Sequence, residues 1–401
     1  FQFKVLDSPV VNAFAVPGGY IYLTRGILAY LDNEAEVAGV IGHEIGHVAA
    51  RHSAQQYTRA TFAQIGLGLG TVLSEEFAAL SGVAQFGVQM LFLKYSRGNE
   101  RQADRLGVEY ATRAGYDASE MANFFRTLDR LHPSSSSGIL PDWFSTHPAP
   151  EQRITTVEAL ATQQARIQDV PERRLQVKRR AYLEQIDGLV FGDDPRQGYR
   201  DKDVFYHPQL RFYFPVPAAW RLNNSPARVQ MVHPDKHAAT IFFLDSKRSP
   251  AAAAQKFISD TKGEVLTSKS TTVNDLPARM LIADITNNQQ ALRVMSVFIA
   301  YEKNTYGFVG FCAPKLFAHY LPDFEKTMIG FAPLTDPQKI DVTPDRVRTF
   351  RIDRNTTLRD ALISQGVETD RLETIALLNG KELTDRIPGN TLLKRIERGS
   401  R

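Results

Sequence analysis

The segment 40–48, Val-Ile-Gly-His-Glu-Ile-Gly-His-Val, holds two histidines four positions apart, with a glutamate directly after the first. On an α-helix, residues at positions i and i+4 lie on the same face, so His43 and His47 can bind one metal ion. Glu44 is rotated by about 100° from His43 and can reach the open side of that ion. This HExxH spacing is typical of a zinc ion whose neighbouring glutamate is a general base for hydrolysis.

A hydrolytic zinc ion needs a third protein ligand, because it takes three side chains and leaves one position for water. The segment 97–107 places Glu100 and Asp104 on one helical face. We expect Glu100 to complete a His2Glu ligand set and Asp104 to accept a hydrogen bond from the outer nitrogen of a ligand histidine. Without the HExxH segment, the same carboxylates would indicate a solvated helix face.

The helix that carries the HExxH segment is expected to begin at Asp32 or Asn33, since either residue can cap it. Glycines at positions 39, 42 and 46 each cost about 1 kcal/mol in a helix interior. Their spacing of three and four predicts that another element packs closely against this helix backbone.

Two strands are expected upstream, at 1–5 and at 20–23, the second opened by a Pro-Gly-Gly turn. A strand just ahead of a metal helix can present a free edge, which pairs with an extended peptide through main-chain hydrogen bonds. Tyr20, Ile21 and Tyr22 are therefore candidate substrate-binding residues. An ordinary core hairpin explains the same residues equally well.

The stretch 65–93 is apolar and rich in glycine and alanine, and three interpretations of it stay open. Its longest uncharged piece, 77–93, is at the short limit of the roughly 17–25 residues that span a membrane. The alternatives are an interfacial helical pair that gives peripheral membrane contact, or buried core helices. Further on, a serine-rich loop at 132–149 suggests a mobile cover, and His147 at its end can meet the metal site.

The segments GHEIGH, NERQADRLG and THPAPEQR, preceded by NAFAVPGGYIYL, closely resemble the zinc peptidases that include the CAAX prenyl protease and its soluble bacterial relatives in envelope quality control. The resemblance covers about residues 1–165. It implies a mainly helical gluzincin protease domain with a small N-terminal β-hairpin and one zinc ion per chain. It also implies a periplasmic or other cell-envelope location, with a signal peptide or lipid anchor upstream.

The resemblance further implies a role for each residue of the site. These roles are zinc ligation by His43, His47 and Glu100, base catalysis by Glu44, acceptance of a hydrogen bond from a ligand histidine by Asp104, and a place near the transition state for His147 and Arg153.

The expected reaction is hydrolysis of peptide bonds in unfolded or misassembled polypeptides. Glu44 takes a proton from the attacking water and passes it to the leaving amine. His147, steadied by Arg153, is the candidate donor to the oxyanion, and its neutral imidazole can also bind zinc and hold the resting enzyme latent. The alternative function is a catalytically quiet chaperone-like or cell-wall-binding protein that keeps the zinc site for stability. The intact Glu44 argues against that alternative.

The pattern of residues 166–401, after the segment covered by the resemblance, predicts that the whole chain is a multidomain α+β protein. A polar linker with one short basic helix is expected at 166–204. Residues 205–335 form strand-rich runs that weakly resemble a PsbP-like α/β sandwich, an antiparallel sheet with helices on one face. Residues 345–398 resemble a small βααβ LysM module, which we expect to be dispensable for hydrolysis.

LysM modules bind glycans of the peptidoglycan type, but Asn355 and Thr356 stand here where Gly-Asp normally precedes Thr-Leu. Docking to an envelope protein, or simple packing, is equally open. The net charge of +4 is mild, and the basic clusters at 173–180 and 394–401 lack interleaved aromatic residues. We interpret these clusters first as solvated surfaces, and second as contacts to an anionic membrane or envelope polymer. Nucleic acid is not expected as a partner.

Overall fold

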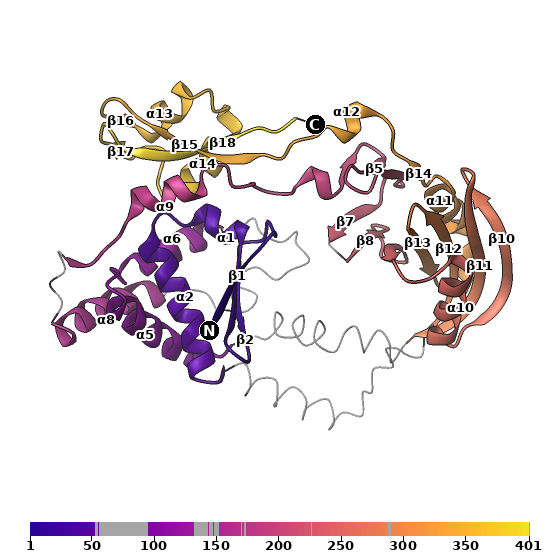
Figure 1. Cartoon of the computed structure of the whole chain (residues 1–401), viewed down its shortest axis with the longest axis horizontal. Coiled ribbons are helices and arrows are strands. Elements are labelled where there is room, and N and C mark those ends of the chain that lie inside the picture. Colours follow the sequence, from indigo (N-terminus) through magenta and orange to yellow (C-terminus); the bar gives the residue numbers. More distant parts are fainter. Residues whose placement is uncertain are drawn as a thin grey trace. The chain divides into compact units, whose positions relative to one another are not determined.

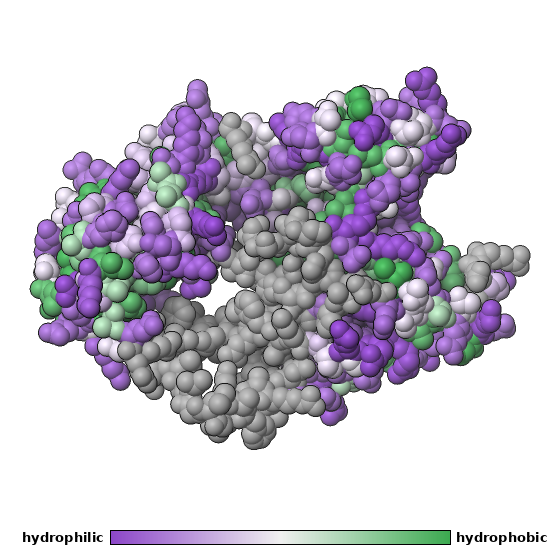
Figure 2. All heavy atoms as spheres, turned by 180° about the vertical axis from the view of Figure 1, so that it is seen from behind, coloured by the Kyte–Doolittle hydropathy of each residue, from purple (hydrophilic) through white to green (hydrophobic). Residues whose placement is uncertain are grey.

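The computed structural model describes residues 1–52, 55, 95–131, 143, 147, 152–169, 171, 174–225, 227–287 and 290–400. The expectations for the stretch 65–93, and most of those for the loop 132–149, lie outside these residues. The described chain forms two compact units, one built from residues within 1–193 together with 344–399, the other from 194–343 (Figure 1). Within the described part, none of the helices is both long and apolar enough to cross a membrane. In Figure 2 its surface is mainly hydrophilic, with smaller apolar areas in between.

The described part of the first unit contains seven β-strands and a group of helices that carries the metal-site residues. Its elements are, in chain order, β1 (Gln2–Leu6), β2 (Ala13–Val16), β3 (Tyr20–Thr24), α1 (Arg25–Tyr30), α2 (Glu34–Ala49), α5 (Arg97–Arg113), α6 (Glu120–Leu131), α8 (Arg153–Ile167), α9 (Arg179–Ile186), β15 (Arg346–Arg351), α13 (Leu358–Ser364), η4 (Thr369–Arg371), α14 (Leu372–Leu378) and β18 (Leu392–Glu397), with β16 (Thr356–Thr357) and β17 (Arg386–Ile387) as a short additional pair.

The N-terminal sheet has the strand order β1-β3-β2. β2 and β3 form the expected antiparallel hairpin, and β1 pairs in parallel with the other side of β3. Both edges of β3 are therefore occupied, and the expectation that Tyr20, Ile21 and Tyr22 present a free edge is wrong. Within the described residues, the free edge nearer to α2 is that of β2.

The helix α2 begins where its capping residues predict. The Asn33 side chain accepts a hydrogen bond from the Glu36 backbone N–H at 2.8 Å, and the Glu36 carboxylate accepts one from the Asp32 backbone N–H at 2.6 Å. The Glu36 N–H in the first turn of α2 and the Asp32 N–H just before the cap residue therefore both have a partner.

The glycines of α2 lie against neighbouring helices, as their spacing predicts. A Cβ at Gly42 would stand 2.8 Å from the Gly107 carbonyl oxygen of α5, and one at Gly46 would stand 3.0 Å from the Ala103 carbonyl oxygen. Gly39 is packed in the same way against Met121 of α6. Side chains at these positions would push α5 away from α2, so the glycines set how closely the two metal-bearing helices approach.

The C-terminal segment shares one hydrophobic core with the helices of the metal site. Leu358, Leu362 and Leu393 belong to the same buried cluster as Val40 of α2 and Phe125 of α6. The basic helix α9, expected in a linker, buries its own apolar side chains, Tyr182, Leu183 and Ile186, in this cluster as well. Residues 344–399 are thus part of the unit that holds α2.

A buried lysine strengthens this connection. Lys394 of β18 is 0% exposed, and its ammonium group donates hydrogen bonds to the carbonyl oxygens of Ala29 at 2.9 Å and Leu31 at 2.8 Å. The same group lies 3.1 Å from an Asp32 carboxylate oxygen. Lys394 was interpreted as part of a solvated basic cluster, and that interpretation is wrong.

The second unit consists of two antiparallel sheets and two main helices. Its elements are η2 (Pro195–Gln197), β4 (Tyr199–Asp201), β5 (Val204–His207), β6 (Phe212–Pro215), β7 (Arg221–Ser225), β8 (Arg228–Val232), β9 (Ala238–Asp245), α10 (Pro250–Thr261), β10 (Glu264–Val273), β11 (Leu276–Asn287), β12 (Gln290–Tyr301), β13 (Asn304–Cys312), η3 (Pro314–Leu316), α11 (Phe317–Ile329), β14 (Ala332–Pro333) and α12 (Pro337–Ile340). The strand orders are β10-β11-β12-β13-β9-β8-β7 and β14-β6-β5-β4.

The helices α10 and α11 lie on opposite faces of the seven-stranded sheet, so the expectation of helices on one face is wrong. On β12, Val294 and Phe298 pack in a cluster with α10, whereas Met295 and Val297 pack in a cluster with α11. Residues of opposite parity on a strand point to opposite faces.

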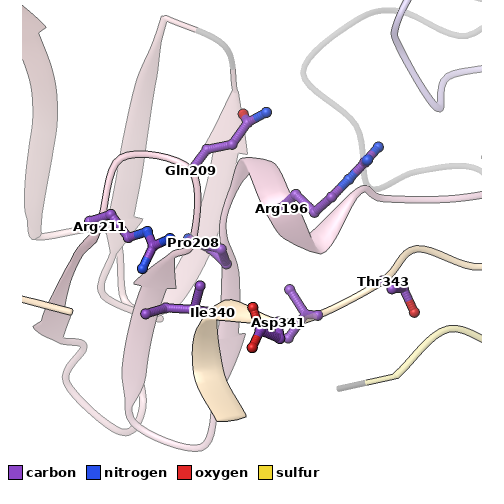
Figure 3. Close-up of a pocket in the computed structure, with 8 residues that line it drawn as sticks. Arg196, Pro208, Gln209, Arg211, Ile340, Asp341 and Thr343 are labelled. Carbon is purple, nitrogen blue, oxygen red and sulfur yellow. The ribbon is translucent and has the colours of Figure 1, made fainter. Parts of the chain in front are cut away.

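An open pocket of about 540 Å³ also lies in the second unit. The turn between β5 and β6, η2 and the chain around α12 line it, and Figure 3 shows the Arg196 and Arg211 side chains at this rim. None of its lining residues belongs to the group of metal-site residues described below.

Candidate metal centre

The structure brings His43 and His47 together on the buried face of α2. Both side chains are 0% exposed, and their Nε2 atoms lie 3.0 Å apart. The i, i+4 spacing produces this arrangement, because consecutive turns place the two imidazoles one above the other.

Glu100 reaches the same point from the first turn of α5. A capping box formed by Ser96 and Asn99 starts that helix, which fixes where Glu100 lies. Its carboxylate oxygens are 3.6 Å from His43 Nε2 and 3.4 Å from His47 Nε2. The carboxylate therefore faces both imidazoles across the close α2–α5 contact.

His147 enters the cluster from the chain between α6 and α8. Its Nδ1 lies 3.0 and 3.1 Å from the two Glu100 oxygens and 3.4 Å from His43 Nε2. Its ring stacks on Trp143, with ring centroids 4.2 Å apart, and its backbone N–H donates to the Trp143 carbonyl oxygen at 2.8 Å. One ligand atom from each of His43, His47, Glu100 and His147 lies within 4.8 Å of the others.

Asp104 and Arg153 surround this group with short polar contacts. Asp104 Oδ1 is 2.9 Å from His43 Nδ1, the outer nitrogen of that imidazole. Arg153 donates to both Asp104 oxygens, at 2.8 and 2.7 Å, and its third nitrogen is 2.9 Å from Glu100. Arg153 was expected to steady His147. The structure pairs it with the two carboxylates, where the guanidinium fork fixes their orientation.

His52 is a residue of the site that the sequence interpretation missed. Its Nδ1 lies 3.0 Å from His47 Nδ1, and its Nε2 lies 3.1 Å from Gln102 Oε1. The chain returns to the site because Arg51 takes a left-handed conformation, with φ of 58°, directly after α2. A histidine five positions after His47 was the available signal, but the helical repeat does not place that position on the metal face.

The protonation states of Glu100 and His47 favour the binding of a metal cation. Burial opposes ionisation of Glu100, but His147, His47 and Arg153 together outweigh it and hold the pKa of Glu100 well below its usual range. Burial lowers the pKa of His47 well below its ordinary value, so this imidazole is neutral. A neutral imidazole and an ionised carboxylate are the forms that bind zinc.

The donor set fits a metal ion for a second reason. His43 Nδ1 is held at the Asp104 carboxylate, and Arg153 keeps that carboxylate ionised by lowering its pKa against the opposing effect of burial. The proton of a neutral His43 therefore sits on Nδ1, and the Nε2 lone pair points at the other ligand atoms. Facing lone pairs in a buried site repel one another unless a cation lies between them.

Glu44 lies beside this group and makes no hydrogen bond within the described part of the chain. Its side chain is 0% exposed, its Oε1 is 3.7 Å from His147 Nε2, and neither carboxylate oxygen has a hydrogen bond to the described residues. Burial raises the pKa of Glu44, and the nearby His147 and His43 partly offset that rise. A raised pKa brings a carboxylate closer to the range in which it exchanges protons near neutral pH.

Two histidines one turn apart, a carboxylate from the next helix and an unpaired glutamate define a metallopeptidase type of site. Residues 1–161 match the model of peptidase family M48. The segment 1–161 is therefore similar to the zinc metallopeptidases of that family, which confirms the resemblance of its four motifs.

Two curated relatives show the extent of the match. The beta-barrel assembly-enhancing protease of Yersinia pestis is 34% identical over 173 residues, which cover 41% of this chain and 35% of that protein. The mitochondrial metalloendopeptidase OMA1 of Arabidopsis thaliana is 36% identical over 153 residues, or 38% of this chain and 30% of that protein. The chain spans about a third of the length of these relatives.

Among solved structures, the cyanobacterial PsbP protein of Synechocystis sp. PCC 6803 matches 34% of this chain and 91% of its own length, at 10% identity and a TM-score of 0.28. That score carries no argument about the fold, so the PsbP-like nature of residues 205–335 stays a prediction.

Proposed function

We propose that this protein is a zinc-dependent endopeptidase that hydrolyses unfolded or misassembled polypeptides in the bacterial cell envelope. The observation that carries the proposal is the buried, unpaired carboxylate of Glu44 beside four convergent ligand atoms. A metal site that only stabilised the fold would gain nothing from such a base. The test is whether the purified chain cleaves reduced casein and whether Glu44→Gln does not.

The proposed ligands are His43, His47 and Glu100. Zinc, when bound there, supplies Lewis acidity that polarises a water molecule and the scissile carbonyl. Glu44 accepts the proton of the attacking water and then donates it to the leaving amine, which a carboxylate of raised pKa can do in both directions. Asp104 orients the His43 ring, and Arg153 orients Asp104 and Glu100.

We assign the pairing of an extended substrate to β2 in place of β3. The outer edge of β2 carries no strand among the described residues, and β2 packs against α2. Main-chain pairing at such an edge binds polypeptides with little regard to sequence, which suits unfolded substrates.

The proposal also includes a cellular location for the protein and a role for its C-terminal residues. The Yersinia pestis relative is named for β-barrel assembly, which supports an envelope location for this chain. For residues 345–398 we keep a LysM-like role, with peptidoglycan or an envelope protein as the partner. The catalytically quiet alternative is disfavoured because it assigns no task to Glu44.

His147 is proposed to hold the resting enzyme latent. Its imidazole takes part in the four-residue ligand group, and a fourth protein ligand would occupy the position that the attacking water needs. The stacked Trp143 ring steadies His147 in this position. Activation therefore requires the imidazole to move away.

The variant His147→Ala is expected to cleave reduced casein faster than the parent, because it frees the fourth position. Cleavage rates at equal zinc loading measure this, with the exposed His237→Ala as the matched control. If kcat instead falls by about 100-fold or more, His147 acts as an oxyanion donor and the latency proposal fails.

A further inference from the structure

A chain of two hydrogen bonds runs from the metal site to the surface of α5. It joins His47 Nδ1 to His52 Nδ1 at 3.0 Å and His52 Nε2 to Gln102 Oε1 at 3.1 Å. His47 and His52 are buried, whereas Gln102 is exposed. The outer nitrogen of His47 therefore has an imidazole as its partner, while that of His43 has the Asp104 carboxylate.

An imidazole partner is ambiguous, since either ring nitrogen can carry the proton. If His52 donated to His47 Nδ1, the proton of His47 would move to Nε2 and block the atom that faces the metal group. The structure places the amide oxygen of Gln102, not its NH2 group, 3.1 Å from His52 Nε2. That oxygen can only accept, so in this arrangement the single proton of a neutral His52 lies on Nε2, and His52 Nδ1 is left as an acceptor. His47 must then donate from Nδ1, which keeps its Nε2 lone pair free.

We propose that Gln102 and His52 are positioning residues that fix the tautomer of His47 and so prepare its Nε2 to bind the metal. The inference rests on the proposed zinc site and adds residues to it. Three residues of helix α5, two positions apart, would then act on the site. Glu100 is the proposed ligand, Gln102 sets the tautomer of His47 through His52, and Asp104 sets the tautomer of His43. Residues at i and i+4 lie on the buried face, and Gln102 reaches His52 around the side of the helix.

The exposed position of Gln102 allows a test that leaves the core intact. The variant Gln102→Glu keeps an acceptor and should keep the parent zinc affinity. The variant Gln102→Lys offers only donors, which forces His52 Nε2 to accept and His52 Nδ1 to donate. Its zinc affinity should fall by about 10 to 100-fold, the usual cost of disturbing a partner of a ligand histidine. Chelator competition with the full chain measures both values.

A double-mutant comparison separates the tautomer from the added charge. In a His52→Leu background, Gln102→Lys should cause no further loss of zinc affinity, because no imidazole is left to reverse. Thermal melts of the zinc-free variants check that each one folds. Imidazole ¹⁵N chemical shifts of the zinc-loaded parent should show the His47 proton on Nδ1.

Two results would overturn the proposal. One is equal zinc affinity in Gln102→Glu and Gln102→Lys, which would mean that the acceptor at position 102 does not matter. The other is an equal loss from Gln102→Lys with and without His52, which would leave only a charge effect. Both outcomes are compatible with a functioning zinc protease, so the proposed function would survive either of them.

Discussion

The variant Glu44→Gln is expected to lose hydrolysis of unfolded protein while keeping one zinc ion per chain. The substitution preserves the size of the side chain and removes no proposed ligand, since the convergent group consists of His43, His47, Glu100 and His147. An amide cannot accept the proton of the attacking water, and a positioned base contributes about 10²- to 10⁴-fold to the rate. Casein cleavage and zinc content, measured on the same preparation, give the two values.

The matched control is Glu109→Gln on α5, which makes the same chemical change at a partly exposed side chain that pairs with Arg105 and Arg113. It should leave both activity and zinc content unchanged. If Glu44→Gln degrades casein at the parent rate, Glu44 is not the base. If it loses zinc as well as activity, the residue stabilises the metal site and its catalytic role is not supported.

The variant Lys394→Met is expected to destabilise the unit that contains α2 by about 3 kcal/mol, the cost of removing one partner of a buried ion pair. Lys394 holds two carbonyl oxygens at the end of α1 and lies 3.1 Å from Asp32. Burial raises the pKa of Glu36, which accepts from the Asp32 backbone, and lowers that of Lys394. Without the lysine, Arg179, whose Nη2 lies 3.6 Å from Asp32 Oδ1, is the cation that remains beside these carboxylates among the described residues.

Urea unfolding can follow this unit alone. The chain has two tryptophans, and in a Trp220→Phe background the fluorescence reports on Trp143 beside the metal group. The exposed Lys4→Met is the matched control and should leave the midpoint unchanged. Truncation after residue 343 should lower the midpoint further, because it also removes Leu358, Leu362 and Leu393 from the shared core. A truncated chain of parent stability and zinc content would contradict the shared core.

Local signals predicted the metal helices well. The HExxH spacing, the Asn33 cap and the glycines of α2 each depend on residues within a few positions, and the structure has all three as expected. The same holds for Glu100, which lies in the first turn of a helix with its own capping box. These predictions succeed because the regular repeat of an α-helix fixes which residues share a face once their spacing in the sequence is known.

Contacts between distant segments were not predictable in this way. The parallel pairing of β1 with β3 changes which strand has a free edge, and nothing in 20–23 signals it. Lys394 stands among arginines that indicated a solvated face, and its burial depends on carbonyl groups more than 360 residues away. His52 contacts His47 only because Arg51 has a positive φ, which the residue type of an arginine does not predict.

The zinc affinity of Glu100→Ala, compared with that of Asp104→Asn and the parent, tests the central claim most directly. The parent should bind one zinc ion per chain. Asp104→Asn should weaken binding by about 10 to 100-fold, as expected for a partner of a ligand histidine, and Glu100→Ala should weaken it by more, because it removes a ligand. Equal zinc retention in the two variants would place the third ligand elsewhere and contradict the account.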